Sequence, residues 1–95
     1  MSYALILSYE AQMEETEAYN YYEDIRAGLG EELLSELEIC YSKISQNPSA
    51  YSYIENSPIL RDVAIARFPY VVIYIASELK ITIVSVKNTH KRPFL

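Results

Sequence analysis

The apolar and polar positions in the first half of the chain predict one short strand and two helices. Residues 2–8 form a short apolar run of strand-compatible side chains, which is typical of a β-strand. Apolar positions then recur at helical spacing over residues 10–27 and again over residues 31–46. The positions expected to face the core are Ala11, Ala18, Tyr22, Ile25 and Leu29 in the first helix and Leu33, Leu34, Leu37, Cys40, Tyr41 and Ile44 in the second. The short link between the two helices predicts an antiparallel hairpin.

The second half of the chain has a strand pattern. Residues 48–58 are rich in Ser, Asn and Pro and predict a loop, with a short extended piece at residues 51–54. Strands are predicted at residues 59–66, 69–77 and 79–87, and the links between them are too short for parallel crossovers, so they form an antiparallel meander. The middle one of these strands is apolar on both faces, which predicts a central place in the sheet.

Together these elements predict an α+β fold in the order β-α-α-β-β-β. The meander and the N-terminal strand would form a four-stranded sheet packed against the helical hairpin. The position of the first strand within that sheet is left open. Ninety-five residues suit one compact domain, residues 1–95. A chain this short buries only a little over half of its unfolded surface, so we expect modest stability without a partner.

The chain offers few signs of membrane, disulfide or cofactor chemistry. No apolar run approaches the length of a membrane span, and the N-terminus lacks the basic region and cleavage site of a secretory signal. A single cysteine, Cys40, excludes an internal disulfide and a cysteine metal cluster. There is no glycine-rich phosphate loop and no metal-ligand spacing. We therefore expect a cytoplasmic protein with no membrane contact, metal or cofactor.

Charge is distributed unevenly along the chain, although the net charge is −5. Residues 1–38 contain ten acidic residues and one basic residue, Arg26, whereas residues 56–95 contain six basic residues and two acidic ones. The helical half would repel nucleic acid, and the sheet half could attract it over a small face.

Two arginines are the first candidates for site chemistry. Arg61 and Arg67 are six positions apart, so they would share one face of a regular strand. Such a pair could hold a phosphate, because the guanidinium presents a planar fork of donors. The alternative is a solvated sheet face or a salt bridge to the acidic helices.

His90 and its neighbours are the second group of candidates. His90 is the only histidine, and Lys87, Lys91 and Arg92 surround it. A histidine in this setting could act as general acid or base in phosphodiester cleavage. The alternative is an exposed histidine without a role.

Tyr70 and Tyr74 lie on one face of the predicted central strand. Tyrosines in this arrangement could stack on bases. Side chains that lie half in the core are the favoured interpretation.

Several of these features, taken in order, resemble the RelE/ParE superfamily, the toxins of type II toxin–antitoxin pairs, also called plasmid stabilisation proteins. They are the second helix ending in Asn47-Pro48, the segment Arg61…Arg67-Phe68-Pro69-Tyr70…Tyr74, and the closing run His90-Lys91-Arg92-Pro93. The resemblance spans nearly the whole chain. It implies a small cytosolic bacterial toxin that inhibits growth and is neutralised by a cognate antitoxin encoded beside it.

The resemblance implies two kinds of activity. RelE-like members cut messenger RNA in the ribosome without a metal, and ParE-like members poison DNA gyrase. If the chain is a nuclease, Arg61 and Arg67 would stabilise the charged phosphorane and His90 would exchange the proton. Lys87, Lys91 and Arg92 would position the RNA backbone and Tyr70 would contact it.

The charge of this chain departs from the RelE type. Those nucleases are strongly basic, because binding that neutralises many phosphates needs many cations, and this chain has eight basic residues in all. The dense lysines of the RelE type are also missing between residues 48 and 58. The ParE-like alternative is therefore favoured, and an inactive, toxin-derived interaction module is a further alternative. A homodimer in the absence of antitoxin is also left open, because a small sheet has edges to protect.

Overall fold

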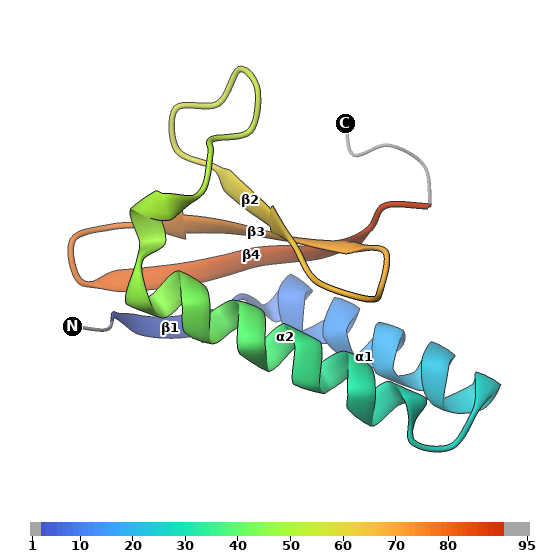
Figure 1. The fold of residues 1–95 in the computed structure, drawn as a ribbon. Helices are drawn as coiled ribbons and strands as arrows, with labels where there is room; N and C mark the ends of the chain where they lie inside the picture. Colours follow the sequence, from blue (N-terminus) through green and yellow to red (C-terminus); the bar gives the residue numbers. More distant parts are fainter. Residues whose placement is uncertain (1–2, 91–95) are drawn as a thin grey trace.

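The computed structural model describes residues 3–90, and its elements follow the predicted order (Figure 1). The strands and helices are β1 (Ala4–Leu7), α1 (Tyr9–Ile25), α2 (Leu29–Gln46), a short 3-10 helix η1 (Pro48–Ala50), β2 (Arg61–Ala64), β3 (Tyr70–Ala76) and β4 (Lys80–Asn88). The predicted α+β order β-α-α-β-β-β is confirmed.

The four strands form one sheet in the order β1-β4-β3-β2. β2, β3 and β4 form the predicted antiparallel meander, and β3 is central as expected. β1 lies at the edge and pairs in parallel with β4, with Leu7 opposite Ile83. This parallel pairing is possible because both helices and two strands lie between β1 and β4 in the sequence.

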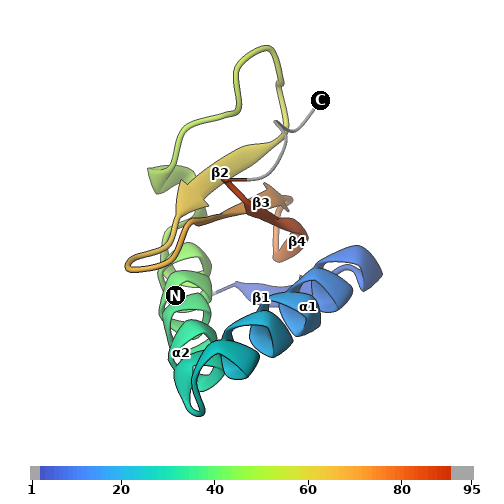
Figure 2. The ribbon, with the colours of Figure 1, turned by 90° about the vertical axis from the view of Figure 1, so that its right-hand side faces the viewer.

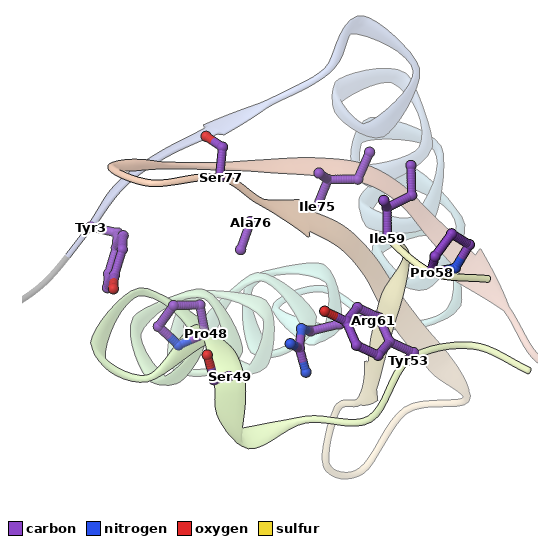
Figure 3. Close-up of a pocket in the computed structure, with 10 residues that line it drawn as sticks. All are labelled: Tyr3, Pro48, Ser49, Tyr53, Pro58, Ile59, Arg61, Ile75, Ala76 and Ser77. Atoms are coloured by element: carbon purple, nitrogen blue, oxygen red, sulfur yellow. The ribbon is translucent and has the colours of Figure 1, made fainter.

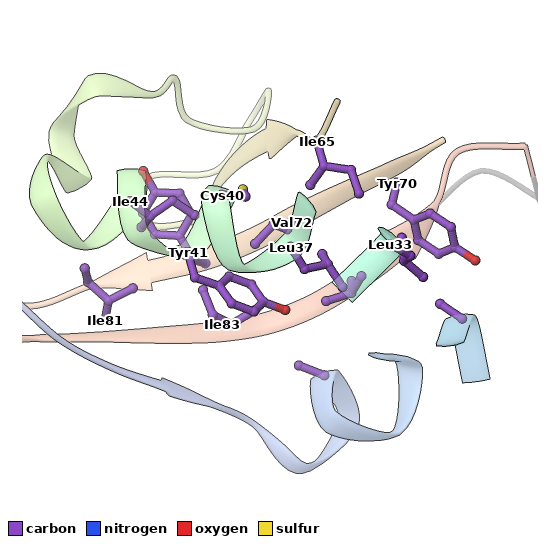
Figure 4. Close-up of a cluster of buried hydrophobic side chains, with 14 residues drawn as sticks. Leu33, Leu37, Cys40, Tyr41, Ile44, Ile65, Tyr70, Val72, Ile81 and Ile83 are labelled. Carbon is purple, nitrogen blue, oxygen red and sulfur yellow. The ribbon is translucent and has the colours of Figure 1, made fainter. Parts of the chain in front are cut away.

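The helical hairpin covers one face of the sheet, as the ribbon shows from two directions (Figures 1 and 2). The segment between η1 and β2 rises on the other side (Figure 1). The core fills the space between hairpin and sheet, with α2 contributing the side chains predicted from its pattern (Figure 4). Its fully or nearly fully buried members include Leu33, Leu37, Ile44, Val72, Tyr74, Ile81 and Ile83.

Local interactions explain where the helices begin and turn. Ser8 caps α1, because its Oγ accepts a hydrogen bond from the Ala11 N–H at 3.0 Å. The Glu23 carboxylate accepts hydrogen bonds from the N–H groups of Gly28 and Gly30, at 2.9 and 2.8 Å, and so holds the link between the helices. Gly28 has φ of +92°, a left-handed conformation that glycine adopts readily.

Three details of the sequence prediction were wrong. Ile25 is 59% exposed and is not part of the buried stripe, because α1 ends at this residue. The second helix begins at Leu29, so Gly30 lies inside it. β2 ends at Ala64, and Arg67 lies in the turn that follows with φ of +72°, so Arg61 and Arg67 do not share a strand face.

Candidate functional site

Arg61 begins β2, at the outer edge of the sheet. An isolated antiparallel bridge pairs it with Tyr53, so the loop before β2 runs beside it. Its Nη1 donates a hydrogen bond to the Tyr51 carbonyl, and its guanidinium carbon lies 3.9 Å from the centroid of the Tyr53 ring. A carbonyl and an aromatic face thus hold the half-buried Arg61 guanidinium in one orientation.

A pocket of about 210 Å³ surrounds this arginine (Figure 3). Arg61 and Tyr53 form one side, and Figure 3 shows the guanidinium reaching inward toward Pro48 and Ser49. The apolar side chains of the wall belong to Pro48, Pro58, Ile59 and Ile75. The pocket therefore combines one fixed cation with apolar walls.

Arg67 has a different environment, because it points to α2. Its Nη2 donates a hydrogen bond to Glu32, and its Nη1 lies 3.5 Å from a Glu36 carboxylate oxygen. The hydrogen bond to Glu32 raises the pKa of Arg67, and the same bond lowers the pKa of Glu32. The salt bridge to the acidic helices, one of the interpretations left open for the two arginines, thus holds for Arg67.

Tyr70 lies at the start of β3, beside the end of β4, and His90 follows β4 in the chain. Asn88, opposite Tyr70 in the register, places its Nδ2 3.4 Å from the Tyr70 hydroxyl. The Tyr70 ring is 6% exposed and packs against Tyr22. Tyr70 and Tyr74 therefore both belong to the core, more deeply buried than the half-buried position that the sequence favoured.

His90 lies in the turn after β4 and is exposed. The backbone N–H of His90 donates a hydrogen bond to Asn88 Oδ1 at 2.8 Å, and the backbone N–H of Thr89 donates one to the Pro69 carbonyl at 2.7 Å. These bonds bring His90 to the end of the sheet where the turn with Arg67 lies. Lys91 and Arg92 lie outside the described residues.

Lys87 is engaged with the first helix. Its Nζ lies 2.9 Å from a Glu14 carboxylate oxygen and 3.4 Å from one of Glu10. Hydrogen bonding to Glu14 raises the pKa of Lys87, against the effect of burial. The Lys87 side chain therefore lies against the acidic first helix, α1.

The predicted catalytic residues do not converge on one point. Arg61 lies opposite Tyr74 in the strand register, whereas Arg67 lies in the turn before Tyr70 and His90 lies beside that turn, four positions away along β3. Four residues of a strand span about 13 Å. Arg61 is therefore separated from the other two by the length of half the strand.

The pocket around Arg61 was missed in the sequence, although one signal for it was present. The extended piece predicted at residues 51–54 supplies the Tyr51 carbonyl and the Tyr53 ring.

Within residues 3–90, no three His, Cys, Asp or Glu side chains gather in a way that could hold a metal ion. No helix in the same range is long and apolar enough to cross a membrane.

Comparison with known proteins supports the fold. Neither a scan against models of protein families nor a search of curated protein sequences finds a match. Among solved structures, the chain is similar to a chain of "Chromosomal ParDE TA system from P. aeruginosa", with a TM-score of 0.81 and 12% sequence identity. The match covers 94% of this chain and 98% of that chain. The chain therefore has the fold of a ParDE system chain, as its resemblance to the RelE/ParE superfamily implied.

Proposed function

We propose that this chain is the toxin of a type II toxin–antitoxin module of the ParE-like kind. It would inhibit growth by binding a macromolecular target such as DNA gyrase, and a cognate antitoxin would neutralise it. The observation that carries this proposal is the similarity, over nearly the full length of both chains, to a chain of a ParDE system. The proposal places the protein in the cytoplasm, where such a target and antitoxin would meet it.

The arrangement of the basic residues favours binding over cleavage. A metal-independent nuclease needs cations and a proton-transfer group around one phosphate. Arg67 is instead paired with Glu32 and Glu36, and Lys87 is paired with Glu14. Two of the cations considered for an RNA site are thus neutralised by the chain's own carboxylates.

One observation favours the alternative, a RelE-like ribosome-dependent mRNA endonuclease. The hydrogen bond from Thr89 to Pro69 brings His90 to the same end of the sheet as Arg67. In that case Arg67, released from its glutamates on the ribosome, would stabilise the phosphate and His90 would exchange the proton. Tyr70, which is buried, would stabilise this end of the sheet by packing in the core.

Growth arrest on expression tests the proposal. The chain is induced in a bacterium with and without the small gene beside its own, and growth, messenger-RNA integrity and plasmid supercoiling are followed together. We expect arrest that the neighbouring gene relieves, with altered supercoiling and intact messenger RNA. Arrest with cleaved messenger RNA would support the endonuclease instead. A folded chain that causes no arrest would refute the toxin proposal and favour an inactive interaction module.

A further inference from the structure

We propose that the pocket around Arg61 binds a segment of a partner protein in which one carboxylate lies next to an apolar side chain. This inference goes beyond the toxin assignment, because it concerns direct binding and requires no particular cellular target. The argument rests on the state of Arg61, on the walls of the pocket and on the charges around it.

Arg61 lacks a carboxylate partner within residues 3–90, unlike Arg26 and Arg67, which both pair with Glu32. A guanidinium has five N–H donors, and the hydrogen bond to the Tyr51 carbonyl uses Nη1. The Tyr53 ring packs on its face. Because these contacts hold the guanidinium without neutralising it, a carboxylate that enters the pocket meets donors already in place.

The walls of the pocket suit an apolar side chain beside that carboxylate. Pro48, Pro58, Ile59 and Ile75 line it, and Ile59 is 56% exposed at its rim. A volume of about 210 Å³ is smaller than a typical pocket for a drug-sized ligand. It accommodates one or two side chains of a peptide, and burial of apolar area on these walls would add to the ion pair.

A single carboxylate fits this site better than a nucleic-acid backbone. Polynucleotides bind through several cations that together neutralise several phosphates. Glu55, Asp62 and Glu78 lie on the segments next to the lining residues, against Arg61 and Lys80 as the basic residues, and this net negative charge repels a polyanion. A single carboxylate brings one negative charge, which the positive charge of Arg61 neutralises.

The probes are two capped dipeptides that differ only in charge, N-acetyl-Leu-Glu-amide and N-acetyl-Leu-Gln-amide. Each is titrated into the full-length ¹⁵N-labelled chain and followed by NMR. We expect the Glu peptide to shift the Arg61 side-chain Nε–H and the amides of Tyr53 and Ser77 in a saturable way. The Gln peptide should bind at least about tenfold more weakly, as the loss of a hydrogen bond to a charged group predicts.

Two variants and a matched control locate the binding. Arg61→Gln should remove the difference between the two peptides. Ile59→Glu, at an exposed position that tolerates a polar side chain, should repel the carboxylate and weaken binding of the Glu peptide. Arg26→Gln removes the same charge from an exposed side chain outside the pocket and should bind the Glu peptide as the unaltered chain does.

Three results would overturn the proposal. One is the absence of saturable shifts at the pocket with the Glu peptide. Another is equal binding of this peptide to Arg61→Gln and to the unaltered chain. The third is tighter binding of hexauridylate than of the peptide at the same amides, which would assign the pocket to a nucleic-acid backbone. Growth arrest that persists alongside any of these results would leave the toxin proposal standing.

Discussion

Glu14 joins the first helix to the last strand through several contacts of one carboxylate. Its Oε1 accepts hydrogen bonds from the Ser85 hydroxyl at 2.7 Å and from the Val86 N–H at 2.8 Å, and its Oε2 lies 2.9 Å from Lys87 Nζ. Burial of Glu14 acts to raise its pKa, but the hydrogen bonds from Lys87, Val86 and Ser85 together hold the pKa below the ordinary value of 4.5. The ionised carboxylate is therefore part of the folded structure.

We predict that Glu14→Gln lowers the free energy of unfolding by about 1–2 kcal/mol at pH 7, through the loss of charge-assisted hydrogen bonds. A depressed folded pKa stabilises the fold at pH values above the unfolded pKa, and this contribution is lost as the pH falls through the folded pKa. The difference between the variant and the unaltered chain should therefore shrink as the pH falls below the unfolded pKa of a glutamate and vanish once the pH is below the folded pKa of Glu14. Urea unfolding at several pH values measures it. Glu55→Gln, on the exposed loop before β2, is the control, and an equal loss there would contradict the prediction.

Tyr74 makes a single polar contact inside the core. Its side chain is fully buried, and its hydroxyl donates a hydrogen bond to the Pro48 carbonyl at 2.6 Å. Burial raises the pKa of Tyr74 to about 12. The hydroxyl links the central strand to the 3-10 helix that forms one wall of the pocket.

Tyr74→Phe should reduce the free energy of unfolding by about 1–2 kcal/mol, because the Pro48 carbonyl loses its donor in a buried setting. Chemical denaturation at neutral pH is the measurement. Tyr9→Phe removes the same hydroxyl from a side chain that is 78% exposed and should leave stability unchanged. If both variants behaved alike, the Tyr74 contact would have no stabilising role.

At the scale of the elements, both sheet edges are partly covered by the chain itself. Beyond the end of β1, the first helix and its cap cover the edge of β4. The Ser8 hydroxyl donates a hydrogen bond to the Val84 carbonyl at 2.9 Å, and the Glu14 carboxylate accepts one from the Val86 N–H. At the other edge, the Ile54 N–H donates to the Leu60 carbonyl at 2.7 Å. Coverage of this kind discourages strand addition by another chain, which leaves pockets and helix faces as the better routes for a partner.

The two helices approach each other closely at Gly30. A Cβ at this position would lie 2.7 Å from the Tyr19 carbonyl oxygen and 2.8 Å from the Tyr19 ring. The carbonyl belongs to the α1 backbone and moves only if the whole helix shifts. Gly30 is therefore required by packing.

Gly30→Ala should destabilise the protein by about 1–3 kcal/mol through overpacking. The direction of the change in the free energy of unfolding is informative, because a Gly→Ala substitution within an exposed helix would stabilise the fold by about 1 kcal/mol. Thermal unfolding followed by circular dichroism gives the answer. A higher melting temperature in the variant would show that the helices separate without cost.

For the whole molecule, the distribution of charge supports the proposal that the chain acts by binding. The acidic helices neutralise Arg67 and Lys87, and Arg61 alone of the three lies in a pocket. A small chain with this arrangement presents one fixed cation beside apolar walls, which suits recognition of a protein surface.

His90→Ala separates the two proposed activities at this scale. If the chain acts by binding, the variant should arrest growth as strongly as the unaltered chain, because His90 is exposed and binding requires no proton transfer. Colony counts after induction provide the measurement. A loss of arrest, with the variant still folded, would favour the endonuclease and would withdraw the ParE-like proposal.

The amino-acid sequence by itself determined the order and kind of the elements. Helical spacing in α2 and the apolar runs of β3 and β4 are local patterns, and the core positions Leu33, Leu37 and Ile44 could be read from them. The central place of β3 followed from its two apolar faces. Such features depend on near neighbours in the chain, so periodicity is enough to predict them.

Only the tertiary structure decided which charged groups meet. Arg67 reaches Glu32 across 35 positions and Lys87 reaches Glu14 across 73, and neither pairing has a local signal. Arg67 lies in the turn after β2 in a left-handed conformation and contacts Glu32, whereas a regular strand would have placed the two arginines on one face. The position of β1 beside β4 and the pocket around Arg61 likewise arise where distant segments pack, because their geometry depends on how the whole chain folds.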